Sequence, residues 1–429
     1  MTRKGTDLGM RHRTGHLLLS LMLLAALRGA VQAEEKPVSP RVFALNPSLL
    51  AVARSRAAAG DPALAPVLAG LRKEADKSLK AGPFSVMDKE KTPPSGEKHD
   101  YLTQAPYWWP DPNKPDGLPY INRDGETNPE SRKGNDDLPF GRLCSNVYTL
   151  ALAYYFTGHE PYAEKAAALM KAWFLDPASK MNPNLNFAQG IPGRNTGRGT
   201  GIIESRDLLK IVDSVGLLEG SPAWTKESVE GMRAWFRAYL EWMLTSKNGQ
   251  AEAKATNNHG TWYQAQVGAF ALFTGDEAKA KAAVEAGKEM IARQIEPDGG
   301  QPLELKRTKS FHYTLFNLSA FFTLGEIGQR IGEDLYNYQT DAGRSIRKAL
   351  DFAAPYYDLA KKWPYKEIKP DTTPNKELAE LLRRAAIVYG DKAYEDLLEK
   401  VDKEGVAASR VPLLWPWPPE KGEAGKVRE

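Results

Sequence analysis

The sequence has 429 residues, of which 42% are hydrophobic and 10% aromatic, enough to build the core of one large domain or two smaller ones. Lys and Arg exceed Asp and Glu by four, but residues 1–33 hold five basic residues and one acid, so the remainder is electrically balanced. This balance excludes a general affinity for nucleic acid or membrane surfaces, and the single cysteine, Cys144, excludes an internal disulfide.

Residues 1–33 have the pattern of a secretory signal peptide. Four basic residues precede an apolar run from Leu17 to Leu27, and Val31 and Ala33 suit a signal peptidase. The run is too short to span a membrane, and no later apolar run is longer. We therefore expect cleavage after Ala33 and export to the periplasm or the cell exterior, with no membrane association afterwards.

Helical periodicity dominates the rest of the chain, and no comparable run alternates as a strand would. Apolar side chains recur at three- and four-residue spacing in nine segments: 142–157, 161–175, 202–218, 224–245, 262–274, 278–295, 313–331, 341–356 and 376–389. Pro, Gly and Asn gather at 104–139 and 181–201, which are too long for ordinary helix connections and so are expected to be functional loops.

A repeated pattern predicts how these helices are arranged. YYFTGHEPYAEKAA from Tyr154 matches FALFTGDEAKAKAA from Phe270, and a fainter copy starts at Ile387. In each copy a Gly ends one helix in a left-handed cap, and an acid favours the start of the next. Because such hairpins bury their apolar faces only by stacking, we expect an all-α toroid over residues 34–404. The Pro-rich tail, residues 405–429, should pack its two Trp on this body.

Two long loops carry side chains suited to an anionic sugar polymer. In the first, the neighbouring rings of Trp108 and Trp109 match the apolar faces of sugars, although one of them is expected to anchor the loop in the core instead. In the second, residues 186–207, five Gly accompany Arg194 and Arg198. This loop is either a lid over the polymer or a solvated segment. It lacks the Gly-Lys-Ser/Thr element of a phosphate-binding loop.

The polar turn TNNHGTWYQAQ at 256–266 is the strongest local signal. Asn257 or Asn258 can cap the helix that follows, but His259 is one of only four His after residue 33, and its place beside two amides favours a functional role. Trp262 and Tyr263 open the same helix, and they either contact substrate or pack in the core.

The segment ELKRTKSFHYTLFNL at 304–318 is the second signal. Lys306, Arg307 and Lys309 precede a helix start that also carries His312 and Tyr313. Cations oppose the dipole at a helix N-terminus, so they are better explained by a bound anion than by a solvated basic loop. Arg307 then serves as a carboxylate clamp beside the phenol of Tyr313, with Lys306 as the alternative clamp.

A uronic-acid lyase needs such a set of groups. The C5 proton becomes removable only when the neighbouring carboxylate is neutralised, which suits the donors Asn258, His259 and Arg307. A phenol with a reference pKa near 10 can take that proton when cations favour its ionised form, and can then return it to the departing C4 oxygen. No metal or cofactor is required. Scattered His and the lack of a GxSxG element exclude zinc-helix and serine-hydrolase readings.

NNHGTWY followed by R…HY resembles the alginate lyase domain family, and the similarity extends from PYWWPDPNKPDG at 106 to about Tyr356. The resemblance implies an incomplete α/α toroid. It also implies that Asn258 and His259 neutralise the substrate carboxylate, that Arg307 assists, and that Tyr313 is the acid and base. Because Lys306 is adjacent to Arg307, either residue could clamp the carboxylate. Because His312 is adjacent to Tyr313, the identity of the base is also undecided between these neighbours and His259.

We therefore expect a polysaccharide lyase that acts on alginate, chiefly on mannuronate-rich stretches, as a monomer. Glucuronan is the close alternative, because mannuronate and glucuronate differ at C2, away from the bond that breaks. A non-catalytic glycan-binding protein and a helical scaffold are further alternatives. Hydrolysis by Asp136, Asp137 or Glu204 is also possible in a helical barrel, although no comparable motif surrounds them.

Overall fold

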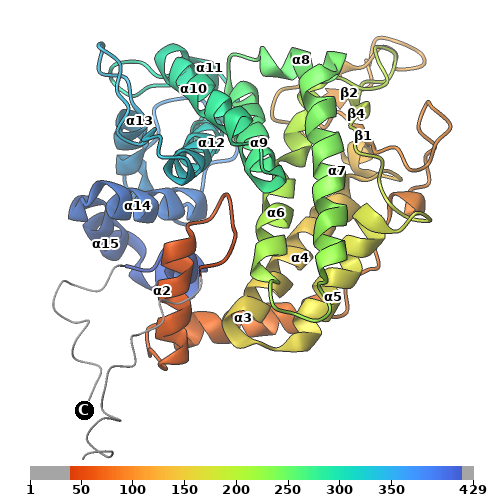
Figure 1. Cartoon of the computed structure of the whole chain (residues 1–429). Helices are drawn as coiled ribbons and strands as arrows, with labels where there is room; N and C mark the ends of the chain where they lie inside the picture. Colours follow the sequence, from red (N-terminus) through yellow and green to blue (C-terminus); the bar gives the residue numbers. More distant parts are fainter. Residues whose placement is uncertain (1–38, 418–429) are drawn as a thin grey trace, which may run out of the picture. The chain divides into compact units, whose positions relative to one another are not determined.

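The computed structural model describes residues 39–417, and the expected signal peptide lies outside them. Within this range the chain is mostly helical (Figure 1). The α-helices are α2 Pro47–Ala58, α3 Ala65–Ser78, α4 Asp137–Thr157, α5 Glu160–Met170, α6 Leu208–Leu217, α7 Lys226–Thr245, α8 Lys247–Ala253, α9 Asn258–Thr274, α10 Glu277–Gln294, α11 Pro302–Leu305, α12 Ser310–Arg330, α13 Ile346–Ala353, α14 Lys376–Tyr389, α15 Lys392–Ala408 and α16 Val411–Leu414. None of the helices between residues 39 and 417 is both long and apolar enough to cross a membrane.

Short irregular elements supply the rest of the framework. A π-helical turn, Lys171–Leu175, extends α5, and 3-10 turns occur at Val86–Asp88, Pro129–Arg132, Gly199–Asp207 (η5) and Ala354–Tyr357. Two small strand pairs complete it: β1 Leu102–Gln104 pairs in parallel with β4 Phe187–Gly190, and β2 Trp108–Trp109 pairs antiparallel with β3 Ile121–Asn122.

The repeated helix–Gly–helix pattern forms the three hairpins that the sequence predicts. Gly158, Gly275 and Gly390 adopt φ values of 65°, 87° and 61°, and each ends a helix in a left-handed cap. The hairpins α4–α5, α9–α10 and α14–α15 follow from them. A glycine is needed at these positions because a Cβ disfavours positive φ.

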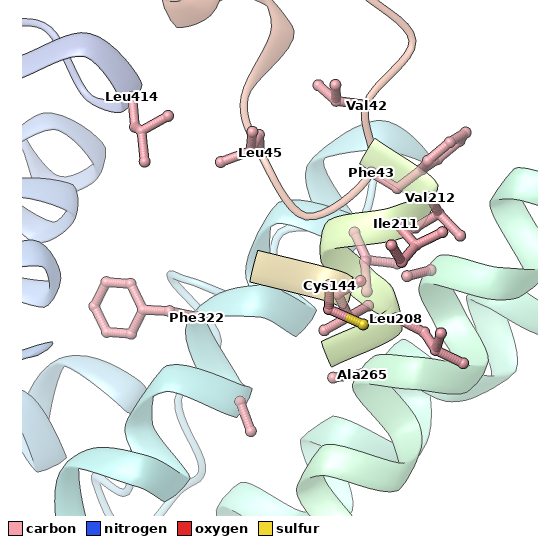
Figure 2. Close-up of a cluster of buried hydrophobic side chains, with 14 of the residues drawn as sticks. Val42, Phe43, Leu45, Cys144, Leu208, Ile211, Val212, Ala265, Phe322 and Leu414 are labelled. Carbon is pink, nitrogen blue, oxygen red and sulfur yellow. The ribbon is translucent and has the colours of Figure 1, made fainter. Parts of the chain in front are cut away.

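Helices α6, α9 and α12 are buried on nearly all sides, because neighbouring helices cover each of them. Helix α9 packs against α6, α7, α10 and α12 (Figure 1). Figure 2 shows part of the resulting core, in which the Cys144 thiol lies near Leu208. This burial raises the pKa of Cys144 far above its usual range, so the thiol is a packing group.

Several helix boundaries differ from the sequence-based expectation. Residues 202–218 are not one helix: their first part belongs to η5, and α6 begins at Leu208. The sequence does not predict helices α2 and α3, and α15, the second helix of the third repeat, continues to Ala408, past the expected domain end at 404. In the tail, α16 adds one helical turn and Trp415 is buried.

A buried ion pair fixes strand β1 to the start of α4. Lys89 and Asp136 both have fully buried side chains, with Nζ and Oδ2 3.2 Å apart. Asp136 also accepts a hydrogen bond from the Leu102 amide at 2.8 Å, while Lys89 donates to the carbonyl of Lys98 at 2.6 Å. Asp136 is thus a structural group, which removes it from the residues considered for hydrolysis.

We expect Lys89→Met to lower the free energy of unfolding by about 3–5 kcal/mol, because it leaves a buried carboxylate unpaired. Burial already raises the pKa of Asp136 to about 6, and Lys89 opposes that rise. Without Lys89 the pKa rises further, so the folded state binds the proton more tightly than the unfolded state does. The loss of stability should therefore shrink as the pH falls from about 8 to about 5.

Chemical unfolding at the two pH values measures this effect. The double variant Lys89→Met, Asp136→Asn is the control, since it removes both charges and should recover much of the stability at the higher pH. An equal loss at both pH values for the single variant would contradict the assignment.

Candidate active site

A cavity of about 450 Å³ lies where the loop after β1, the segment from β4 through η5, and the first turns of α9 and α12 meet. Seven of the residues predicted for the lyase site line it: Trp108, Arg198, Asn258, His259, Arg307, His312 and Tyr313. The two polar motifs that are about 50 residues apart in the chain therefore reach one site.

His259 is held in a fixed orientation at the start of α9. Its backbone N–H donates to the side chain of Asn257, which caps the helix as one sequence-based alternative proposed. The ring Nδ1 lies 2.6 Å from Oε1 of Glu252, a buried residue of α8. With Nδ1–H donating to this carboxylate, Nε2 is the nitrogen left for a ligand.

Asn258 is fully buried and is held by a second glutamate. Its backbone N–H donates to Oε1 of Glu304 at 2.8 Å, and its Nδ2 donates to Oε2 at 2.7 Å. Its Oδ1 has no hydrogen-bond partner within residues 39–417. Burial raises the pKa of Glu304, although both bonds from Asn258 oppose that rise. The amide has one further N–H and a free oxygen with which to bind a substrate.

Tyr313 and Arg307 are in direct contact. The guanidinium carbon of Arg307 lies 3.6 Å from the centroid of the phenol ring, and the Tyr313 hydroxyl is 2.8 Å from that of Tyr107. Arg307 also forms a two-pronged ion pair with Asp124, in which Nη2 donates to Oδ1 at 2.5 Å and Nε donates to Oδ2 at 3.2 Å. The cation is thereby fixed against the phenol.

The ionisation of Tyr313 differs from the sequence-based expectation. We expected nearby cations to lower its pKa, and Arg307 does act in that direction. Burial is the larger effect, however, and the neighbouring Tyr107 adds to it, so the pKa of Tyr313 is raised well above its ordinary value. The phenol is therefore neutral at neutral pH in the protein alone.

The other predicted residues at the cavity have distinct environments. Trp108 belongs to β2, and the guanidinium of Arg194 stacks on it, 5.0 Å from the ring centroid. His312 reaches solvent at its edge, and its pKa is lowered by desolvation first and then by cations, including Lys309. Its ring is thus neutral near pH 7.

Six predicted contact residues do not line the cavity. Trp109 donates from Nε1 to the Glu126 carbonyl at 2.9 Å, and Arg194 donates to the Tyr120 carbonyl at 2.8 Å. The remaining four are the cap residue, two core aromatics and an exposed lysine: Asn257, Trp262, Tyr263 and Lys306. Of the two residues predicted as alternative clamps, Arg307 lines the cavity and Lys306 does not.

The glycine-rich loop, predicted to be a lid or a solvated segment, is exposed at residues 193–196 and closely packed at Gly197 and Gly201. A Cβ on Gly197 would stand 2.0 Å from the Asn186 carbonyl oxygen, and one on Gly201 would stand 2.5 Å from the Ala188 side chain. These glycines permit close approach of backbones. The loop brings Arg198 to the cavity, where it donates to Gln189 at 2.7 Å.

The structure also brings residues to the cavity that the sequence motifs did not mark. They are chiefly the lining residues Gln104, Tyr107, Asp124, Gln189 and Arg206, together with the supporting acids Glu252 and Glu304. Tyr107 adjoins the Trp pair, Glu304 adjoins the basic segment and Gln189 lies within the glycine-rich loop, so proximity to a motif was the available signal. Glu252 had none.

Two acids considered for hydrolysis, Asp137 and Glu204, do line the cavity. Burial raises the pKa of Glu204 to about 7, with the nearby charge of Asp137 adding to it. Its Oε2 accepts hydrogen bonds from Tyr101 at 3.0 Å and Thr103 at 2.8 Å. No group of three or more His, Cys, Asp or Glu in the described range is placed to hold a metal ion.

Comparison with known proteins decides between elimination and hydrolysis. The model of the alginate lyase family matches residues 85–363. This chain belongs to the alginate lyase family. As a family member it is a polysaccharide lyase, and the mostly helical α/α toroid predicted from the sequence is confirmed. Among curated proteins, no sequence matches the chain significantly.

Solved structures agree with this membership of the alginate lyase family. A crystal structure of an alginate lyase from Bacteroides ovatus is 41% identical, with a TM-score of 0.84 over 88% of this chain and 99% of that one. Alginate lyase A1-III from Sphingomonas species A1, as a histidine-to-alanine variant complexed with tetrasaccharide, is 15% identical, with a TM-score of 0.58 over 90% and 98%. At that identity the likeness supports the fold alone.

Proposed function

We propose that this lyase cleaves alginate, chiefly at mannuronate residues, with Tyr313 as base and acid. The observation that carries the proposal is the convergence of Asn258, His259, Arg307 and Tyr313 at one cavity. Cationic and amide donors beside a phenol are what removal of a proton next to a carboxylate requires. The B. ovatus relative, an alginate lyase by name, supports the choice of polymer.

The side chains at the cavity support the following β-elimination. The substrate carboxylate binds to the donors of Asn258, His259 and Arg307, which stabilise the second negative charge that forms when C5 loses its proton. The ionised oxygen of Tyr313 takes that proton, and the electron pair forms the C4=C5 double bond as the C4–O4 bond breaks. The same tyrosine then donates its proton to O4.

Tyr107 contacts the base directly. In the neutral state the Tyr313 hydroxyl donates to that of Tyr107 at 2.8 Å, and this bond adds to the rise in the pKa of Tyr313. Once Tyr313 has lost its proton to solvent, the Tyr107 hydroxyl can donate to the phenolate instead. The stacked guanidinium of Arg307 stabilises the same charge. Asp124 weakens this stabilisation, because its negative charge forms an ion pair with the same guanidinium and raises the pKa of Tyr313.

The test uses the protein from residue 34 onward, with defined polymannuronate, polyguluronate and glucuronan as substrates. We expect ultraviolet absorbance from the conjugated 4,5-unsaturated uronate, strongest with polymannuronate. New reducing ends without absorbance would mean hydrolysis, and binding without turnover would mean a glycan-binding protein. Faster turnover of glucuronan would replace alginate as the substrate and leave the catalytic groups as assigned.

The cell compartment is a further part of the proposal. The basic and apolar pattern of residues 1–33 supports export to the periplasm or beyond, where polymeric uronans are accessible. Mass determination of the protein recovered from the cell envelope and medium tests it, with an N-terminus at Glu34 expected.

A further inference from the structure

A second polar cluster lies in the wall of the cavity that β1, β4 and η5 form, apart from the proposed catalytic groups. Its centre is Gln189, the only non-glycine residue from 39 to 417 with a positive φ, at 50°. Side chains with a Cβ disfavour this conformation, and it persists mainly where the surroundings enforce it, often at functional sites.

The surroundings of Gln189 fix both its backbone and its side chain. Its N–H donates to Oγ1 of Thr103 at 2.9 Å, and this hydroxyl donates to Glu204 at 2.8 Å. Its Oε1 accepts a bond from Nη2 of Arg198 at 2.7 Å, and its amide also interacts with Glu204. The buried Glu204 thus contacts both Thr103 and Gln189 and holds the cluster together. Gln189 lines the cavity.

Several polar atoms around Gln189 are unused. Nε2 of Gln104, Nε of Arg198 and Oγ1 of Thr200 are buried and have no hydrogen-bond partner within the described residues. All three side chains line the cavity. Buried polar atoms are normally paired, so these three atoms, which line a cavity, are available to hydrogen-bond the hydroxyl groups of a ligand.

This wall is built from other elements than those that supply the carboxylate donors in the proposed function, although Arg198 lies near enough to Glu252, the partner of His259, for their charges to interact. The carboxylate donors come from the first turns of α9 and α12 and from the residues just before α12. In a pyranose ring C2 lies across the ring from C5, which bears the carboxylate. A ring held through its carboxylate at those helix starts therefore presents its C2 and C3 hydroxyls to another part of the cavity.

We propose that Gln189 and Arg198 bind the C2 and C3 hydroxyls of the uronate and so determine the preference between C2 epimers, mannuronate and glucuronate. The inference rests on the proposed lyase function. It assigns the choice between C2 epimers to residues other than the four that bind the carboxylate and move the proton. A site that hydrogen-bonds a hydroxyl discriminates strongly against a substrate that leaves its buried polar groups unpaired.

The experiment compares kcat/KM on polymannuronate and on glucuronan. We expect the wild-type protein to favour one polymer by about tenfold or more. Gln189→Asn, which tolerates the left-handed backbone but is one methylene shorter, should reduce that ratio at least about fivefold. Arg198→Lys should act in the same direction, and Arg194→Lys, in the same loop but outside the cavity, should leave the ratio unchanged.

Gln189→Gly separates specificity from folding. Glycine relaxes the backbone at φ 50°, which offsets part of the cost of losing the side-chain bond to Arg198, so this variant should stay folded while losing the preference. Equal losses on both polymers, or a wild type without preference, would overturn the inference and leave the lyase function intact. Absence of elimination products from both polymers with the wild type would instead overturn the proposed function, and this inference with it.

Discussion

Tyr313→Phe should reduce the rate of β-elimination by roughly 10²–10⁴-fold, because it removes the group that both takes and returns the proton. The ring should keep its place, since Phe retains the stacking surface for Arg307. KM should therefore change much less than kcat. The measurement is the initial rate of formation of the unsaturated product from polymannuronate, with substrate binding followed by calorimetry.

Two other tyrosines provide matched controls for Tyr313→Phe. Tyr107→Phe removes only the hydroxyl that neighbours Tyr313, so we expect a smaller fall, about tenfold. Tyr263→Phe removes a buried hydroxyl bonded to the Met243 carbonyl, outside the cavity, and should affect stability but not kcat. A Tyr313→Phe enzyme within a few-fold of the wild-type rate would exclude the phenol as base and acid.

The raised pKa of Tyr313 also predicts the direction of the pH dependence. Burial favours the neutral phenol, so the ionised fraction at neutral pH is small and increases as the pH rises. The rate with wild-type protein should therefore increase from neutral to mildly alkaline pH. A rate that falls over this range, with the protein still folded, would contradict a phenolate base.

Local patterns in the sequence predict most of the helices and the main polar residues of the cavity, but not the partners that hold those residues. The Gly caps and the polar turns before α9 and α12 are short motifs, and each determines its own structure largely by itself. The partners of these motifs are distant: Asp124 lies 183 residues from Arg307, and Glu304 lies 46 from Asn258. Such pairings of loop residues follow no periodicity, so a single sequence does not predict them.

The errors in the predicted contact residues have a physical cause. Trp262 and Tyr263 belong to α9, which neighbouring helices cover on nearly all sides beyond its first turn, so these two aromatic side chains are buried in the core and do not line the cavity. Lys306 and Arg307 are equivalent as charges in the sequence. Only the ion pair with Asp124, which requires the folded loop before α4, directs Arg307 toward Tyr313.

Each group assigned to the substrate carboxylate is held by an acid of the protein: Arg307 by Asp124, His259 by Glu252 and Asn258 by Glu304. These acids fix the donors before substrate arrives, which is the condition for electrostatic stabilisation of a developing charge. They also place negative charge near an anionic substrate. The three acids therefore improve the orientation of the donors and weaken the general electrostatic attraction for the anionic polymer. This agrees with the near-zero net charge of the chain after residue 33.

The contact between His259 and Glu252 makes His259 a second residue on which the rate should depend strongly. His259→Ala should lower kcat by roughly 10²–10³-fold, because it removes a donor to the charge that develops on the carboxylate when C5 loses its proton. Glu252→Gln keeps the size of the partner but no longer fixes Nδ1–H as the donor, so the ring can turn or change tautomer. We expect an intermediate fall in kcat, with folding retained.

His312→Ala is the control that distinguishes this role from a general need for histidine in the cavity. Its lowered pKa keeps that ring neutral near pH 7, so it cannot supply positive charge to the carboxylate. Its removal should alter KM more than kcat, and kcat should stay at least tenfold above that of His259→Ala. If the two variants lose kcat equally, or if Glu252→Gln behaves as the wild type, the carboxylate is neutralised without the Glu252–His259 pair, and Arg307 and Asn258 must suffice.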